Sequence, residues 1–473
     1  MKQSINNFYI PITLFVIAFC SKLLFIESRD ICLDEPFTIF HAQFPIADIL
    51  SLPSQNEPNP PLFMLLLHSW IKLFGISPFA VRILPLLFNS FTVVFIYFIG
   101  KKFFNLWTGI LASSIFLVST YHFYFGLETR TYSLLSMATA ASLYYFLSLV
   151  NFPKRKYIIA IILTNLLLIY SHYFGWFIVF VQFISCFLYL KNKTIIKFMF
   201  YVFLITGVLF LPMLSIVLKQ FLHSSQGTWV QIPSRSDFYT QFYYFFNGKY
   251  ILIIFVCILI FTFSYLIYYK LFNAINKQLI IVLSWWIIPY SIMFILSFKI
   301  PMFINRYILF NTIGLYLFVA IIIYLLPKKL SYIVGTIFIL LFYKELQINS
   351  KDFYYREVKN LVDNVKRENT PNSVILIYPH WADLGFMYYY DRTVFQNYEN
   401  YESLLVKKNI YNVWNSNEAA EKLKILHNKR ILYVQDGQLE DYSLFNLLDS
   451  TKTLKYSAFY PQCFQFSVFK PRI

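Results

Sequence analysis

The sequence predicts a mainly α-helical, polytopic membrane protein with a small α/β domain at its C-terminal end. The chain has 473 residues, of which 58% are hydrophobic and only 13% are charged, and its mean hydropathy is +0.57. It contains several apolar runs of about 20 residues, the length that an α-helix needs to cross a bilayer. A soluble core of this size does not require such runs. We therefore expect a transmembrane helical bundle.

About eleven apolar segments are candidates for membrane spans. They are 8–26, 81–100, 107–122, 130–150, 157–171, 173–190, 199–218, 250–268, 279–297, 306–326 and 330–343. The first is expected to remain in the mature protein, because no small-residue cleavage site follows it. Basic clusters follow every second segment, at residues 101–102, 154–156, 191–197, 270–277 and 328–329. This positive-inside pattern places the N-terminus in the cytoplasm and the loop after the first span outside.

The positive charge has a topological explanation. The formal net charge is +17, but the basic residues of the membrane part lie between spans, where they set orientation and meet lipid headgroups. No basic arm or groove-reading motif accompanies them. We predict membrane lipids and not nucleic acid as partners. The small basic inner loops suit a multi-pass protein of a bacterial inner membrane.

A second domain is predicted from residue 344 onward, so the expected domains are 1–343, the transmembrane part, and 344–473. Hydrophobicity falls there, and helical and strand-like patterns alternate. The expected elements are a helix over 353–369, a strand over 373–379, helices over 381–390 and 417–426, a strand over 430–436, and a strand-like stretch over 457–470. The threading of the spans places this domain on the extracytoplasmic side. No glycine-rich phosphate loop follows either strand, so nucleotide binding is not expected.

Acidic residues gather in one outer loop. Six of the chain's 23 acidic residues lie between Glu27 and Pro61, and only Glu128 and Asp237 are added before residue 344. In so apolar a chain, such carboxylates are held in water or serve chemistry. We interpret residues 27–80 as an outer catalytic loop. It is expected to carry juxtamembrane helices over 34–44, 46–52 and 62–75.

Three arginines begin spans at this outer face, namely Arg82, Arg130 and Arg306. A cation at a helix N-terminus opposes the helix dipole, so these positions suggest a bound anion. The alternative is that each side chain extends to the lipid headgroups.

Several motifs together resemble the GT-C membrane glycosyltransferases of glycosyltransferase family 39, which include the protein O-mannosyltransferases and the lipid A aminoarabinose transferase. They are Leu33-Asp34-Glu35, Asn59-Pro60-Pro61-Leu62, residues 79–82, residues 124–135, Ser171-His172-Tyr173-Phe174-Gly175 and Arg306-Tyr307. The resemblance covers roughly residues 8–326 and implies a GT-C fold. It departs at Asn59, where bacterial members commonly have histidine, and at Leu127, where they often have glutamine.

The resemblance also implies roles for individual residues. Asp34 is the expected catalytic base, and Glu35 beside it is expected to orient a neighbouring group, such as an arginine. From their positions at span starts that face the acidic loop, Arg130, Arg306 and Arg82 are the expected ligands of the donor phosphate. Substrate contacts are assigned to Glu128, Asn59, His172, Tyr132 and Tyr307. For the acids, a solvated helix start is the alternative, and for the tyrosines it is an interfacial aromatic belt.

No metal is predicted in the membrane part, because Glu57, His41, His68 and His172 lack metal-ligand spacing. No cofactor is predicted either, although the need for a divalent metal stays open.

The activity that the resemblance implies is an inverting transfer of a sugar, a hexose or pentose, from a polyprenyl-phosphate donor to a hydroxyl of a lipid, glycan or protein. Such a transfer needs a base for the acceptor but no strong acid, because a phosphate leaves as an anion. Two alternatives remain. One is a ligase or polymerase that uses a lipid diphosphate donor, and the other is a transporter or flippase, which predicts charged mid-span residues and matching broken helices.

Overall fold

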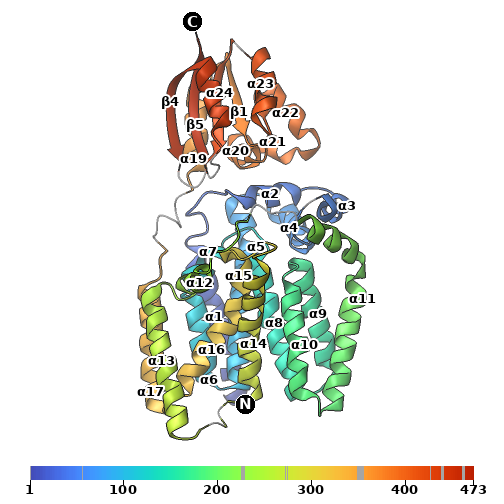
Figure 1. Cartoon of the computed structure of the whole chain (residues 1–473), viewed down its shortest axis with the longest axis vertical. Helices are drawn as coiled ribbons and strands as arrows, with labels where there is room; N and C mark the ends of the chain where they lie inside the picture. The colour runs from blue at the N-terminus through green and yellow to red at the C-terminus, as the bar shows by residue number, and fades with distance from the viewer. Residues whose placement is uncertain are drawn as a thin grey trace. The chain divides into compact units, whose positions relative to one another are not determined.

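The computed structural model describes residues 2–55, 57–224, 230–271, 273, 275–348, 356–426, 428–437, 441–460 and 464–472 (Figure 1). The chain divides into two compact units that do not follow its linear order. Unit 1 comprises Met1–Leu24, Leu50–Phe63 and Arg82–Ile348. Unit 2 comprises Phe25–Ile49, Met64–Val81 and Asn349–Ile473. Much of the acidic outer loop therefore belongs to the same unit as the C-terminal residues.

Unit 1 is a bundle of apolar helices. Its long helices are α1 (Lys2–Leu23), α5 (Pro78–Phe103), α6 (Leu106–Leu117), α8 (Tyr132–Asn151), α9 (Arg155–Ser171), α10 (Gly175–Cys186), α11 (Lys193–Ser224), α13 (Lys249–Tyr268), α14 (Lys277–Leu296), α16 (Thr312–Tyr324) and α17 (Lys328–Lys344). Shorter helices are η1 (Leu52–Gln55), α7 (Thr120–Phe125), η2 (Phe187–Tyr189), α12 (Asp237–Phe245), α15 (Asn305–Ile308) and η4 (Leu309–Asn311). The prediction of a mainly helical membrane part is confirmed.

The predicted number of spans is not confirmed. Among the described residues, six helices are long and apolar enough to cross a membrane: 78–103, 132–151, 193–222, 249–268, 277–296 and 305–324. Four shorter apolar helices cover 9–23, 62–74, 106–117 and 175–189. Several predicted spans thus form helices that are too short to meet the length of a bilayer core alone.

The helices of unit 1 differ in what surrounds them. The apolar window within residues 305–324, which form α15, η4 and α16, is 89% buried by protein, whereas those of α11 and α13 are only 22% buried. Phe200 on α11 is 61% exposed, and Ile260 on α13 is 62% exposed. Continuous exposed apolar surface is unfavourable in water but is compatible with lipid. We infer that α16 is central and that the outer faces of α11 and α13 meet acyl chains.

Unit 2 is built around a mixed five-stranded sheet in the order β2-β1-β3-β5-β4. Its strands are β1 (Ser373–Tyr378), β2 (Ile410–Asn412), β3 (Arg430–Asp436), β4 (Lys452–Tyr460) and β5 (Phe464–Pro471). β1 pairs in parallel with β2 and β3, and β5 pairs antiparallel with β3 and β4. The accompanying helices are α19 (Val358–Glu368), α20 (Ala382–Tyr390), α21 (Arg392–Gln396), η5 (Tyr398–Asn400), α22 (Tyr401–Lys407), α23 (Ser416–Ile425) and α24 (Ser443–Thr451). The predicted small α/β domain is present.

Unit 2 also contains helices from the outer loop, namely α2 (Asp34–His41), α3 (Ile46–Ser51) and most of α4 (Leu62–Phe74). Phe40 of α2 packs against Phe395 and Tyr401, with ring centroids 5.4 and 4.9 Å apart. The Tyr389 hydroxyl accepts a hydrogen bond of 2.6 Å from the backbone N–H of Ile31. The loop therefore contributes to the hydrophobic core of unit 2.

Candidate active site

Asp34 and Glu35 begin α2 in unit 2. Leu33, immediately before them, has a φ of 58°, a left-handed backbone conformation that turns the chain sharply into the helix. Asp34 is half-buried, and its carbonyl oxygen accepts a hydrogen bond of 3.0 Å from the Thr38 hydroxyl. A carboxylate in the first turn is favoured by the helix dipole. Asp34 thus lies in the first turn of α2, with its backbone carbonyl bound to Thr38.

Glu35 takes part in a buried ion pair with Arg356. Its Oε2 lies 3.2 Å from Nη1 of Arg356, and the two side chains are 1% and 0% exposed. A buried charge requires such a partner, because desolvation of an unpaired ion is very unfavourable. Glu35 thus pairs with Arg356, a residue that the sequence analysis did not single out.

A second ion pair fixes the chain just before α2. Asp30 Oδ1 lies 3.2 Å from the Lys359 ammonium, and its Oδ2 accepts a hydrogen bond of 2.8 Å from the Lys359 backbone N–H. Lys359 and Arg356 both lie in or next to α19. The start of the acidic loop is therefore attached to α19 through two carboxylates.

Glu57 and Asn59 lie in unit 1. The Asn59 amide donates a hydrogen bond of 2.9 Å to Oε1 of Glu57, and both side chains are buried. The amide of Gln220 on α11 donates to the backbone oxygens of Pro53 and Glu57, at 2.6 and 2.7 Å. The segment before Pro60 is thereby fixed to α11. Asn59, predicted to contact substrate, orients the Glu57 carboxylate.

Arg130 and Glu128 lie in the turn before α8, and both side chains are buried. The Arg130 backbone N–H donates a hydrogen bond of 2.7 Å to the Glu128 carbonyl oxygen. The next residue, Thr131, donates its hydroxyl to the Ser171 carbonyl oxygen at 2.8 Å. This bond joins the start of α8 to the end of α9, next to His172.

His172 lies between α9 and α10 and close to several predicted site residues. Its Nδ1 accepts a hydrogen bond of 3.2 Å from the Phe174 backbone N–H, which defines the orientation of the ring. The Arg130 guanidinium acts electrostatically on this ring, and the Glu57 carboxylate acts on the adjacent Tyr173. Segments around residues 57, 130 and 172 therefore lie near one another within unit 1.

Tyr307 completes this group. Its ring centroid lies 5.6 Å from that of His172 and 6.5 Å from that of Tyr132. The Arg306 guanidinium lies 5.8 Å from the centroid of the Tyr307 ring. Unit 1 thus brings together Arg130, Tyr132, His172, Arg306 and Tyr307, which we call the arginine–tyrosine cluster.

Arg82, the third arginine predicted to bind phosphate, lies in α5. It lies one turn into α5, which begins at Pro78 and not at residue 81, and its side chain is fully buried. Its predicted role in binding phosphate stays a prediction, as does a shared pocket for Asp34 and the arginines.

Lys22 is a buried cation that the sequence analysis did not single out. It lies at the end of α1, is 0% exposed, and donates a hydrogen bond of 2.8 Å to the Asn89 side-chain oxygen. The Asn89 amide in turn donates to the His122 carbonyl oxygen at 3.4 Å. A lysine inside an apolar run was the available signal, because a buried ammonium is costly unless it is bound.

The histidines considered for metal binding have other partners. Nδ1 of His41 lies 2.9 Å from the Phe37 carbonyl oxygen, and Nδ1 of His68 lies 2.9 Å from the Ala42 carbonyl oxygen. Among the described residues, the group with metal-ligand geometry lies instead at His380, Asp383 and Glu402 in unit 2.

Solved structures with the same fold define the class. The chain is similar to ArnT from Cupriavidus metallidurans in the apo state, with a TM-score of 0.63, 11% identity and 97% of each chain covered. ArnT from the same organism bound to undecaprenyl phosphate gives a TM-score of 0.56, 11% identity and the same coverage. The archaeal oligosaccharyltransferase AglB from Archaeoglobus fulgidus, in complex with an inhibitory peptide and a dolichol-phosphate, gives a TM-score of 0.52 and 10% identity, covering 97% of this chain and 74% of that one. This chain therefore has the fold of the GT-C glycosyltransferases, as its sequence motifs predicted.

A family match agrees with this class. Residues 58–218 match the family model described as dolichyl-phosphate-mannose-protein mannosyltransferase. The matched segment includes Asn59, Glu128, Arg130 and His172. No curated protein sequence matches the chain. At 10–11% identity, the structural likeness shows the fold alone.

Proposed function

We propose that this protein is an inverting glycosyltransferase that moves a sugar from a polyprenyl-phosphate donor to an acceptor hydroxyl on the outer face of a bacterial inner membrane. The family match and the fold support a transferase of this class. Two structures with this fold hold undecaprenyl phosphate and a dolichol-phosphate, which supports a lipid phosphate as the donor carrier. The C-terminal part of unit 2 is then extracytoplasmic.

The arginine–tyrosine cluster is the observation that carries this proposal. Arg130 precedes α8 and Arg306 lies in α15. The Arg306 guanidinium lies 5.8 Å from the centroid of the Tyr307 ring, and that centroid lies 5.6 Å from the centroid of His172. Guanidinium groups bind phosphate through paired N–H donors, and backbone N–H groups at a helix start add to the attraction. This combination suits a phosphate whose sugar stacks on tyrosine.

The reaction then requires one base. Asp34 takes the proton of the acceptor hydroxyl, and the hydroxyl oxygen attacks the anomeric carbon from the side opposite the phosphate. The bond between the anomeric carbon and the phosphate oxygen breaks, and polyprenyl phosphate leaves as an anion held by Arg130 and Arg306. Because the leaving group needs no proton, a second catalytic carboxyl is not required. Glu35, through its pair with Arg356, acts as a positioning residue for α2.

Asp34→Asn in the full-length protein tests the base. The variant is reconstituted with polyprenyl-phosphate sugars carrying a labelled hexose or pentose, and with acceptor supplied as native membranes. Release of polyprenyl phosphate and transfer of label are both measured. Loss of a positioned general base lowers turnover by at least about 100-fold. Donor binding, measured separately, is expected to remain.

Asp48→Asn is the matched control. Asp48 is an exposed acid in the first turn of α3, in the same loop and in the same kind of helix position as Asp34. It should retain wild-type turnover. Full turnover of Asp34→Asn would remove Asp34 from the mechanism. A requirement for a lipid diphosphate donor would instead identify a ligase or polymerase.

A further inference from the structure

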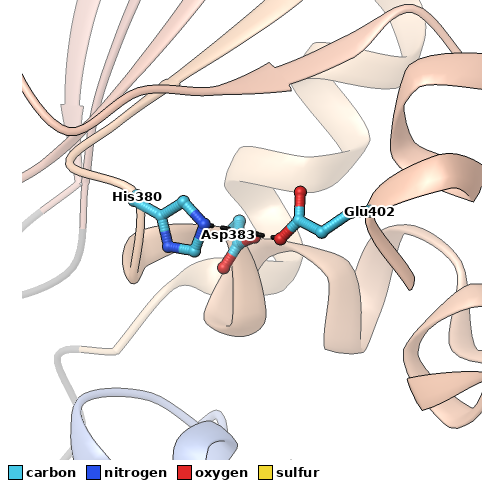
Figure 2. Close-up of side chains that lie close together, drawn as sticks. All are labelled: His380, Asp383 and Glu402. Atoms are coloured by element: carbon cyan, nitrogen blue, oxygen red, sulfur yellow. Dashed lines mark ion pairs between the residues drawn. The ribbon is translucent and has the colours of Figure 1, made fainter. Parts of the chain in front are cut away.

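Three side chains of unit 2 lie together near the carboxyl ends of β1 and β2. His380 follows β1, Asp383 lies in the first turn of α20, and Glu402 lies in α22. Each offers one ligand atom, and these atoms all lie within 4.8 Å of one another. Figure 2 shows the Asp383 carboxylate between the imidazole of His380 and the carboxylate of Glu402. His380 Nε2 lies 3.4 Å from Oε1 of Glu402.

Neighbouring groups orient two of these side chains. The indole of Trp414 stacks on the His380 ring, with centroids 4.5 Å apart and an angle of 7° between the planes. The Asn412 amide, at the end of β2, donates a hydrogen bond of 2.7 Å to Oδ2 of Asp383 and reaches both oxygens of Glu402 at 3.4 Å. Such partners are typical of metal sites, where they hold the ligands in position before the ion binds.

Asp383 is the least satisfied member of the group. Its side chain is buried, with 1% of the residue exposed, and its Oδ1 has no hydrogen-bond partner within the described part of the chain. The neighbouring Tyr401 hydroxyl interacts with this carboxylate, but the two groups do not reach ordinary hydrogen-bond geometry. A buried carboxylate oxygen without a donor is costly, and a cation would remove that cost.

We infer that His380, Asp383 and Glu402 form a binding site for a divalent cation of the zinc type. One imidazole nitrogen and two carboxylate oxygens are a ligand set that suits zinc, whereas calcium and magnesium prefer six or more oxygens. The Glu402 side chain is 61% exposed and that of His380 is 29% exposed, so solvent reaches the group. Three protein ligands and an accessible side leave one coordination position for water or a ligand.

The location agrees with this inference. In α/β sheets, ligands bind outside the carboxyl ends of parallel strands. His380 and Trp414 follow the parallel strands β1 and β2, whose residues Ile377 and Asn412 are paired. The alternative is that the group remains a protonated histidine paired with Glu402 and binds no metal. A metal site would bind zinc at neutral pH, whereas a plain ion pair would not.

Zinc binding to the full-length, detergent-purified protein tests the inference, with the affinity tag removed and the metal stripped by a chelator. Titration calorimetry with zinc chloride, and elemental analysis after dialysis, are expected to give one zinc per chain. His380→Asn, Asp383→Asn and Glu402→Gln should each weaken zinc binding at least about tenfold. Millimolar magnesium should not displace the zinc.

Glu399→Gln is the matched control, because Glu399 is an exposed acid three residues before Glu402. It should bind zinc like the wild type. Cobalt(II) should quench fluorescence from Trp414, zinc should reverse this quenching, and Trp414→Phe should lose the signal while it still binds zinc. Since Glu402 is largely exposed, Glu402→Gln is expected to fold even where Asp383→Asn does not. Absence of zinc from the wild type, or equal binding by Glu402→Gln, would overturn the inference.

Discussion

The buried pair between Glu35 and Arg356 predicts how substitutions next to the proposed base affect stability. Both side chains are at most 1% exposed, and their charged atoms lie 3.2 Å apart. Removal of one member of such a pair costs about 3–5 kcal/mol, because the buried charge that remains loses its ion-pair partner. For a unit of this size, that corresponds to a fall of roughly 6–20 °C in the unfolding midpoint.

The two single substitutions should differ in their dependence on pH. In Glu35→Gln the buried guanidinium cannot lose its proton, so no pH relieves the cost. In Arg356→Met the carboxyl can become neutral. With an ordinary glutamate pKa of about 4.3, protonation costs about 3.7 kcal/mol at pH 7 and about 1 kcal/mol at pH 5. When the pKa of a group is higher in the folded than in the unfolded protein, as expected for Glu35 in Arg356→Met, the protein is more stable at low pH and loses that stability as pH rises. Arg356→Met should therefore recover between pH 7 and pH 5.

Thermal unfolding of the detergent-purified protein, followed by proteolysis of unit 2 at each temperature, measures both effects. The double variant Glu35→Gln/Arg356→Met should be more stable than Glu35→Gln, because neither charge of the buried pair remains. Lys359→Met is the control: Lys359 is 54% exposed in its pair with Asp30, so its loss should cost at most about 1 kcal/mol. Additive effects in the double variant, or no recovery of Arg356→Met at pH 5, would refute the buried-pair explanation.

Two further predictions concern single side chains. Arg130→Lys keeps the positive charge but loses the paired N–H donors of the guanidinium, so turnover should fall at least about tenfold. Arg235→Lys is the control, because Arg235 is exposed, and it should not change turnover. Equal turnover of both variants would contradict the proposed phosphate contact. Burial raises the pKa of Asp391, but the Lys408 ammonium at 2.8 Å and the N–H groups at the start of α21 lower it to about 2. Because the pKa of Asp391 is lower in the folded than in the unfolded protein, its charged carboxylate contributes stability above about pH 4, and this contribution is lost as pH falls toward 2. In acid-unfolding measurements, Asp391→Asn should therefore cost about 1 kcal/mol at pH 7 and almost nothing at pH 2.

Apolar runs and the alternation of apolar and polar residues predicted most of the helices and strands. The strand expected over 373–379 is β1, and the strand expected over 430–436 is β3. The stretch 457–470 was expected as one strand-like segment but contains β4 and β5, and residues 461–463 lie outside the described residues. β2 was missed because its three residues are too few to show a period of two. Short elements of this kind depend on neighbouring strands more than on their own sequence.

The grouping of the acidic loop with the C-terminal residues could not be predicted in this way. A change in hydropathy marks where the chain leaves the membrane, but it does not say which segment packs on which. The contact between Glu35 and Arg356 joins residues 321 positions apart. Each charge alone resembles a solvated residue in the sequence, and only burial identifies the pair. The proposed base is therefore oriented by residues that the sequence assigns to another domain.

The candidate metal site could not be predicted from the sequence either. His380 and Asp383 are three residues apart, and Glu402 follows 19 residues later, a spacing that matches no familiar zinc motif. The group forms because α20, α21 and α22 return the chain to the edge of the sheet at β2. If the site binds zinc, unit 2 holds both the proposed base and a cation whose open coordination position is suited to an oxygen ligand. Loss of zinc in Glu402→Gln with unchanged turnover would then separate the metal site from sugar transfer.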